Sequence, residues 1–302
     1  MILVTGSEGL IGRHVSSALS ASGHAVRRFD LGRSPIEDVR SSEAVARALE
    51  GVTGVLHLAA MSRVAHAETD PEGCHATNVE GLGKLLRLCL ARRNRPWMIF
   101  VSSREVYGQQ AVLPVSEDAA LLPINAYATS KVQGERLIAQ ASVAGLQTNI
   151  CRLSNVYGCP HDHRDRVTMA FAAAAVRGGV ARVEGADCIF DFTYITDVAD
   201  GLCRLVDATI AGERLPPVHF VSGRGTTLGA LANLAKSVSA HPVQIIEAPA
   251  RTFDVSRFVG DPARARALLS WQATTTVEHG LATLVRAMQK VDAGALPPGV
   301  EV

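Results

Sequence analysis

Three glycines follow the first apolar run of the chain and lead into the first turn of its first helix-like segment. Gly6, Gly9 and Gly12 have the spacing G-x-x-G-x-x-G, and the strand-like run 2–4 precedes them. Glycines at such a turn let backbone N–H groups approach a pyrophosphate at the start of a helix, where the helix dipole favours negative charge. A glycine triplet could also serve only as a tight turn. Its place between a strand and a helix nevertheless predicts a dinucleotide site.

Strand-like and helix-like segments alternate through the first half of the chain. The strand-like runs cover residues 2–4, 25–29, 55–58, 97–101 and 148–153, and the helix-like segments cover 10–21, 74–93 and 126–144. This alternation is typical of βαβ units with a parallel sheet covered on both faces. We expect an α/β fold, a Rossmann-type doubly wound parallel sheet with a smaller C-terminal α/β substrate domain.

The rhythm changes after about residue 156, where a polar loop at 158–166 leads into a helix of small residues. Helices are predicted at 197–207 and 227–238, a strand at 218–221, and a further short helix opened by Asp261 and Pro262. We assign residues 1–155 and 188–222 to the dinucleotide-binding domain, and 156–187 and 223–302 to the second domain. The tail with Pro297, Pro298 and Gly299 is expected to fray.

Charge and cysteine usage narrow the class of protein. The formal net charge is +1, with no long basic run, which argues against nucleic acid and membrane surfaces as partners. None of the six cysteines has C-x-x-C spacing, so we expect no metal site. The N-terminus does not look like a signal peptide, and no apolar segment approaches the ~20 residues that cross a bilayer. We therefore expect a cytoplasmic protein with reduced thiols.

An acidic residue ends the second strand-like run. Asp30 lies about 20 residues after the glycines, where a carboxylate accepts hydrogen bonds from an adenosine ribose and repels a 2′-phosphate. This favours NAD over NADP, although the nearby Arg33 could accommodate that phosphate. Asp30 could also be a simple turn residue before Gly32. Asp38 and Val39 are candidates for adenine contacts, with helix capping as the alternative for Asp38.

A tyrosine and a lysine share one face of the helix predicted at 126–144. Tyr127 and Lys131 are four residues apart, so they lie on one helical face. An ammonium beside a phenol favours the phenolate, which would let a group with an ordinary pKa near ~10 act as a base. A packed tyrosine with an exposed lysine is the alternative. Ser102 and Ser103 end the strand-like run 97–101, at the sheet edge where ligands bind.

In this order and spacing, the motifs resemble the extended short-chain dehydrogenase/reductase family, especially its NAD-dependent nucleotide-sugar epimerases and dehydratases. The resemblance covers nearly the whole chain. Its pieces are the glycine loop, Asp30, and residues 57–60, 78–81, 101–108, 127–131, 152–158, 191–195 and 251–254.

The resemblance implies a role for each matching residue. Tyr127 would be the base, Lys131 its partner that also holds the nicotinamide ribose, and Ser103 the hydroxyl that bridges substrate and Tyr127. Asn78 matches a structural or substrate-side asparagine, with a helix-start cap as the alternative. The expected cofactor contacts are Gly6, Gly9, Leu10, Ile11, Gly12, Asp30, Arg33, Asp38, Val39, Leu58, Ala59, Ala60, Asn78, Val101, Tyr127 and Lys131. The expected substrate contacts are Ser62, Ser103, Arg104, Glu105, Asn155, Arg166, Val167, Arg182 and Arg251.

Two departures from the family pattern bear on the substrate. Phe190 stands where the family often has an arginine, so one phosphate contact is missing or comes from elsewhere, such as Arg166 or Arg182. Arg104 follows Ser103 where the fullest dehydratase signature has an aspartate, although Glu105 remains. Arg104, or an arginine of the 158–166 loop, could bind a C6 carboxylate. The alternative is an Arg104 that points outward and pairs with Glu117 or Asp118.

We therefore expect a nucleotide-sugar C4 epimerase that binds NAD and acts on a UDP-hexose or a UDP-uronate such as UDP-glucuronate. The 4,6-dehydratase and 4-ketosugar reductase are alternatives, and a non-catalytic NAD-binding sensor is a further one. The segments 74–93 and 126–144 resemble helices that pair across a family dimer, which indicates a homodimer; apolar helical faces of this kind suit the internal core equally well.

Overall fold

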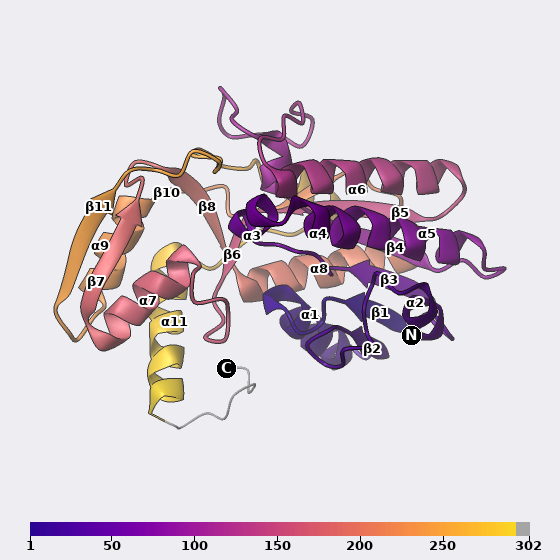
Figure 1. Ribbon diagram of the computed structural model, residues 1–302, viewed down its shortest axis with the longest axis horizontal. Coiled ribbons are helices and arrows are strands. Elements are labelled where there is room, and N and C mark those ends of the chain that lie inside the picture. Colours follow the sequence, from indigo (N-terminus) through magenta and orange to yellow (C-terminus); the bar gives the residue numbers. More distant parts are fainter. Residues whose placement is uncertain (294–302) are drawn as a thin grey trace.

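A six-stranded parallel sheet forms the centre of the computed structural model, which describes residues 1–293 (Figure 1). The predicted frayed tail lies outside the described residues. The strand order is β2-β1-β3-β4-β5-β9. The strands are β1 (Ile2–Thr5), β2 (Val26–Phe29), β3 (Gly54–His57), β4 (Trp97–Ser103), β5 (Thr148–Leu153) and β9 (Val218–Phe220). Each neighbouring pair is parallel, so the predicted parallel sheet is confirmed.

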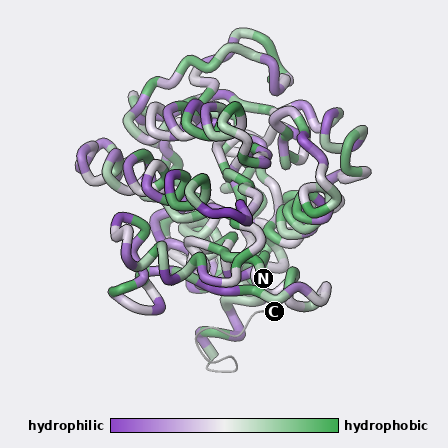
Figure 2. Tube along the Cα trace, turned by 90° about the vertical axis from the view of Figure 1, so that its right-hand side faces the viewer, coloured by the Kyte–Doolittle hydropathy of each residue, from purple (hydrophilic) through white to green (hydrophobic). Residues whose placement is uncertain are grey.

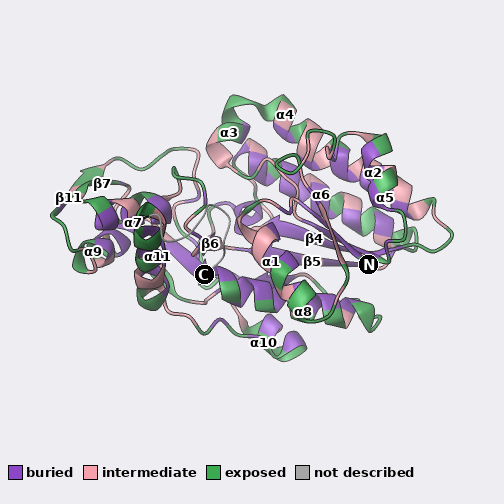
Figure 3. Cartoon of the chain, turned by 90° about the horizontal axis from the view of Figure 1, so that it is seen from below, coloured by how far each residue is buried: buried purple, intermediate pink, exposed green. Residues whose placement is uncertain are grey.

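Helices cover both faces of this sheet. Leu3 of β1 belongs to a buried cluster with α2 (Ser42–Ala48), α5 (Leu82–Leu90) and α6 (Ala126–Val143). The next residue, Val4, belongs to a cluster with α1 (Leu10–Ala21) and α8 (Ile195–Ile210). Successive side chains of a strand point to opposite faces, so the apolar runs fill two separate layers. In Figure 3, β4 and β5 are buried while the helices keep exposed sides, and Figure 2 shows both hydrophilic and hydrophobic stretches along the helical coils. The predicted doubly wound fold is confirmed.

A smaller α/β region lies beside the main sheet (Figure 1). It contains α7 (Val167–Arg177), α9 (Leu228–Ser237), α11 (Val277–Asp292) and the parallel pair β7 (Gly179–Glu184) and β11 (Val243–Ala248). A three-stranded sheet adds β6 (Asn155–Tyr157), β8 (Ile189–Tyr194) and β10 (Gly225–Thr227). One continuous hydrophobic cluster joins this region to the main sheet. The residue limits of the two domains stay a prediction.

The helix predicted at 74–93 differs most from expectation. It is divided into α4 (Pro71–His75), a π-helical turn (Ala76–Gly81) and α5. Such turns are frequent at functional sites. Here the turn carries Asn78, which is buried and hydrogen-bonded to Met61 in the loop after β3 and to Ser130 of α6.

Two short helices differ from the sequence expectation: α10 (Ala263–Leu269) begins later than predicted, and α3 (Val64–Thr69) was not predicted. The helix α10 begins at Ala263 with Pro262 at its N-cap position, while the Asp261 side chain accepts a hydrogen bond from the Ala263 N–H at 2.9 Å. The short helix α3 follows β3. No helix in the described part of the chain is both long enough and apolar enough to cross a membrane.

Gly12 offers a direct test of the packing between α1 and the glycine loop. A Cβ at this position would lie 2.1 Å from the Gly6 carbonyl oxygen and 2.7 Å from the Ser7 Cα. We expect Gly12→Ala to lower the free energy of unfolding by about 1–3 kcal/mol, because the helix must move away from the loop. The measurement is urea unfolding of the protein without added ligand.

Gly9→Ala is the matched control for this substitution. At Gly9 a Cβ would come no closer than 3.4 Å to another heavy atom, and the backbone φ is −71°. Its stability should stay within about 0.5 kcal/mol of the wild type. An equal loss in both variants would show that the close approach at Gly12 is not what stabilises the loop.

Candidate active site

A cavity of about 970 Å³ runs along the carboxyl ends of the parallel strands. It extends from the glycine loop, past β4 and α6, to β7 and the segment after β11. The strand order reverses beside β1, since β2 lies on one side and β3 on the other. This reversal creates a crevice where open parallel sheets bind ligands.

The glycine loop closes one end of this cavity. Gly6 has a φ of +71°, and a Cβ there would lie 2.6 Å from the Ala59 nitrogen, so the loops after β1 and β3 touch through backbone alone. Asp30 lies beside the loop, where its carboxylate accepts hydrogen bonds from the Glu8 N–H at 3.0 Å and the Gly32 N–H at 2.6 Å. This end of the cavity therefore offers close backbone and a carboxylate, the features that fit a dinucleotide.

Most of the predicted cofactor residues line the cavity: Gly6, Gly9, Leu10, Ile11, Gly12, Asp30, Asp38, Val39, Leu58, Ala59, Ala60, Val101, Tyr127 and Lys131. Two do not. Arg33 lies outside the lining and pairs with Glu37 at 3.5 Å. Asn78 lies behind the lining, where it accepts from the Met61 N–H at 2.8 Å and donates to Ser130 Oγ at 2.9 Å. The helix-start cap considered for Asn78 is wrong, because Asn78 is inside the π-helical turn and holds the loop after β3 instead.

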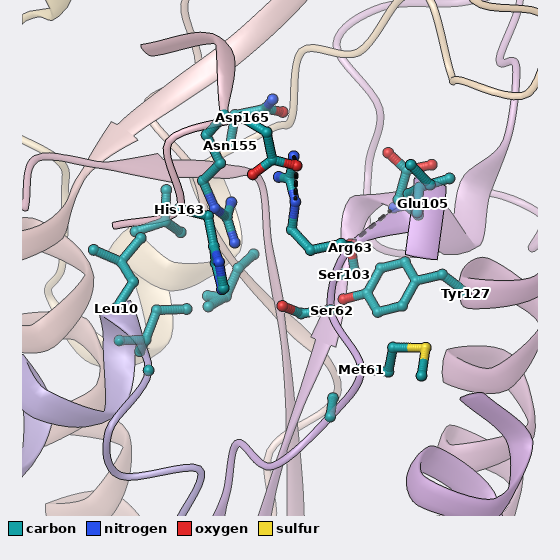
Figure 4. Close-up of a pocket in the computed structure, with 18 of the residues that line it drawn as sticks. Leu10, Met61, Ser62, Arg63, Ser103, Glu105, Tyr127, Asn155, His163 and Asp165 are labelled. Atoms are coloured by element: carbon teal, nitrogen blue, oxygen red, sulfur yellow. Dashed lines mark hydrogen bonds and ion pairs between the residues drawn. The ribbon is translucent and has the colours of Figure 1, made fainter. Parts of the chain in front are cut away.

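Tyr127, Ser103 and Lys131 all line the cavity, and Figure 4 shows Tyr127 beside Ser103. Tyr127 lies in the first turn of α6, which Asn125 caps by accepting a hydrogen bond from the Ala128 N–H at 2.7 Å. Ser103 ends β4 and lies beside the Tyr127 side chain (Figure 4). Lys131 donates to the Val101 carbonyl at 2.9 Å, and its Nζ lies 5.9 Å from the centre of the Tyr127 ring. The end of β4 and the start of α6 therefore bring a phenol, a hydroxyl and an ammonium to the same part of the cavity wall.

Burial dominates the protonation of this group. It raises the pKa of Tyr127 to about 12, against the smaller opposing effect of the Ser103 hydrogen bond. It also lowers the pKa of Lys131 to about 8, because the charged ammonium loses its hydration. In the protein alone the phenol pKa is therefore raised, and the cation that most opposes this rise is Arg166. A further positive charge near the ring is needed before the phenol can work as a base at neutral pH.

Arg104 is buried in the wall of the cavity. Its guanidinium lies 4.8 Å from the centre of the Phe190 ring, pairs with Glu105 at 2.7 Å and donates to Asn155 Oδ1 at 3.0 Å. The alternative of an outward Arg104 is wrong: the acids at 117 and 118 pair with Arg264 instead. Because Glu105 already neutralises it, Arg104 is a fixed part of the wall.

The remaining predicted substrate residues also line the cavity: Ser62, Asn155, Arg166, Val167, Arg182 and Arg251. The arginines among them are paired with acids. Arg182 lies 3.3 Å and Arg251 2.6 Å from Glu184, and Arg166 lies 3.1 Å from Asp162.

Sequence reasoning missed several lining residues, among them Arg63, His163, Asp165, Glu184 and Asp254. His163 and Asp165 belong to the 158–166 loop, whose unusual polarity was the available signal. The sequence near Arg63 and Glu184 gave no such signal, because their ion-pair partners lie 102 and 67 residues away in the chain. Burial raises the pKa of Asp254, and the negative charge of Glu105 adds to this effect.

Comparison with known proteins identifies the family to which the chain belongs. The model of the "NAD dependent epimerase/dehydratase family" matches residues 2–216. A UDP-glucose 4-epimerase of Rhizobium meliloti (strain 1021) is 28% identical over 303 residues, which cover 90% of this chain and 92% of that protein.

Two solved structures are similar over nearly the whole chain. UDP-glucose 4-epimerase from Thermotoga maritima, solved with UDP-glucose, has a TM-score of 0.89 at 26% identity and covers 96% of this chain and 99% of its own. TunA, described as an NAD dependent NDP-hexosamine 5,6-dehydratase, has a TM-score of 0.86 at 30% identity and covers 96% and 97%. Relatives of both reaction types occur at similar identity.

The buried Lys131 predicts a pH dependence of stability. Its pKa falls from 10.5 to about 8 on folding, so between these values the unfolded chain holds a proton that the folded chain has released. Stability therefore rises as pH increases from about 8 to about 10.5, the window in which the cost of a buried charge disappears. We expect wild type to gain stability relative to Lys131→Met over this window, measured by urea unfolding.

Lys236→Met, at an exposed lysine of α9, provides the control and should leave the pH profile of wild type unchanged. A constant difference between wild type and Lys131→Met at every pH would contradict the lowered pKa of Lys131.

Proposed function

Since the chain belongs to the NAD-dependent epimerase/dehydratase family, we propose that it is a nucleotide-sugar C4 epimerase. Its substrate in this proposal is a UDP-hexose or UDP-uronate, which passes through a transient 4-keto intermediate. The observation that carries the proposal is the meeting of Tyr127, Ser103 and Lys131 in one cavity with the glycine loop.

The residues of the cavity fit NAD. At Gly6 the backbone packs directly on the backbone of Ala59, with no space for a Cβ, and the carboxylate of Asp30 lies beside the loop. Such a carboxylate favours a free ribose hydroxyl over a 2′-phosphate. When bound, NAD supplies the hydride acceptor and a positively charged ring.

Each catalytic side chain then has a defined task. Tyr127 removes the proton of the sugar C4 hydroxyl, and Ser103 holds that hydroxyl and the phenol in line. Lys131, anchored on the Val101 carbonyl, orients the neighbouring ribose and adds positive charge beside the phenol. Arg182 and Arg251 are the cations available for the diphosphate once it displaces their shared partner Glu184, whereas Asp162, the partner of Arg166, is only 2% exposed and is costlier to displace.

The environment of Glu105 favours epimerisation over dehydration. Elimination of the C6 hydroxyl needs an additional acid–base group, and Glu105 is the remaining candidate in the signature segment. One of its oxygens pairs with Arg104 and the other accepts a hydrogen bond from Asn125 at 3.1 Å. With both oxygens engaged, this carboxylate is held as part of the wall and not free to exchange protons.

The proposal also covers the oligomeric state of the enzyme and its place in the cell. We place the interface of a homodimer on α5 and α6, which stand side by side at one edge of the molecule (Figure 1). We assign the enzyme to the cytoplasm.

Turnover without added reductant tests the function. Purified protein loaded with NAD should convert UDP-glucose or UDP-glucuronate to its C4 epimer with no net consumption of NADH, because hydride returns to the sugar. Tyr127→Phe should lower kcat by about 10²–10⁴-fold while NAD binding is retained, since only the proton acceptor is lost. The readouts are product analysis and cofactor titration.

Other outcomes would assign another function. Stoichiometric loss of NADH would identify a reductase, and a 4-keto product with a deoxygenated C6 would identify a dehydratase. Full activity of Tyr127→Phe would contradict the role of the phenol.

A further inference from the structure

An ion pair crosses the cavity between two segments far apart in the sequence. Arg63 belongs to the loop between β3 and α3, and Asp165 to the 158–166 loop between β6 and α7. The Arg63 guanidinium lies 2.6 Å (Nη2) and 3.2 Å (Nε) from one Asp165 carboxylate oxygen. Both residues line the cavity, and Figure 4 shows the Arg63 side chain reaching Asp165.

The backbone that carries Arg63 is fixed beside the catalytic phenol. Met61 and Val64, on either side of it, pack in one apolar cluster with Tyr127. Asn78 holds Met61 through both its N–H and its carbonyl, at 2.8 and 3.2 Å. Arg63 therefore starts from a rigid position at the reacting end of the cavity.

The partner of Arg63 is easier to displace than the partner of Arg104. The Asp165 side chain is 55% exposed, whereas Glu105, which pairs with Arg104, is only 7% exposed. An exposed carboxylate regains water when it leaves, so the exposed pair contributes little free energy, while a buried pair is costly to break. The Arg63 side chain itself is only 17% exposed, so it would keep an anion from bulk water.

The geometry of a sugar limits which anion can reach this place. If C4 meets Tyr127, the adjacent carbons are C3 and C5, and a carboxylate at C6 is attached to C5. The diphosphate is attached at C1, across the ring from C4. A C6 carboxylate is the same functional group as the Asp165 side chain, so a guanidinium can bind either through charged hydrogen bonds.

Resting on the proposed function, we propose that Arg63 is a specificity-determining residue that binds the C6 carboxylate of a uronate substrate, in the place that Asp165 occupies without substrate. Asp165 then acts as an internal competitor that leaves when the substrate enters. The substrate class of the site is therefore the nucleotide-linked uronates.

Affinities of three ligands for the NAD-loaded protein test this inference. Calorimetry would compare UDP, UDP-glucose and UDP-glucuronate, which share the diphosphate and differ in the sugar. Wild type should bind UDP-glucuronate most tightly. Arg63→Ala should weaken UDP-glucuronate binding by about 10- to 100-fold, because a charged hydrogen bond is lost, and change the other two by less than about 2-fold.

A second variant predicts the opposite change. Asp165→Asn removes the competitor while Arg63 remains, so UDP-glucuronate should bind more tightly than to wild type. Arg177→Ala is the matched control, since Arg177 forms a similar exposed pair with Asp292 at 2.8 Å outside this cavity. It should leave all three affinities unchanged.

The outcomes separate this inference from the proposed function. An equal loss for all three ligands in Arg63→Ala would assign Arg63 to the UDP part, and no loss for any would reduce the pair to a structural contact; either overturns the inference. Tighter binding of UDP-glucose than of UDP-glucuronate by the wild type would also overturn the inference. Binding requires no turnover, so a selective effect of Arg63 would stand even if the bound sugar were not epimerised.

Discussion

The burial of Tyr127 at the start of α6 is the constraint on which the site depends. Burial raises the pKa of this phenol to about 12 and lowers that of Lys131 to about 8, so in the protein alone the tyrosine keeps its proton. The same burial removes water that would screen a nearby charge. A positive ring in the adjacent crevice would therefore act strongly on the phenol, which links cofactor binding to the activation of the base.

The cavity meets its ligands with charges that are already paired. Arg63, Arg104, Arg166, Arg182 and Arg251 each lie within ion-pair distance of an acid. Pairs with exposed partners can exchange them for the anionic groups of a substrate, whereas the buried pair of Arg104 and Glu105 shapes the wall. Pairing with acids within the protein thus explains how one cavity holds many arginines without a large net field.

Local sequence spacing predicted the parts of the site that lie within one element. The glycine loop, Asp30, and the pair Tyr127 and Lys131 could be read from strand–helix order and helical periodicity. Contacts between distant segments could not: Arg63 and Asp165 are 102 residues apart, and nothing local marks either as a partner. Asn78 was recognised by resemblance, but its part in holding Met61 depends on a π-helical turn that periodicity does not predict. Arg104 was a candidate because it follows Ser103, but only its packing against Phe190 shows that its side chain turns inward.

The most direct test of the central claim is the pKa of Tyr127 itself. Ultraviolet difference titration of wild type against Tyr127→Phe would report ionisation of this phenol with oxidised NAD, with NADH and without cofactor. The account predicts a pKa near 12 without cofactor and a fall toward neutrality only with the oxidised, positively charged form. The same high pKa in all three states would contradict it, because the phenol could not then act as the base.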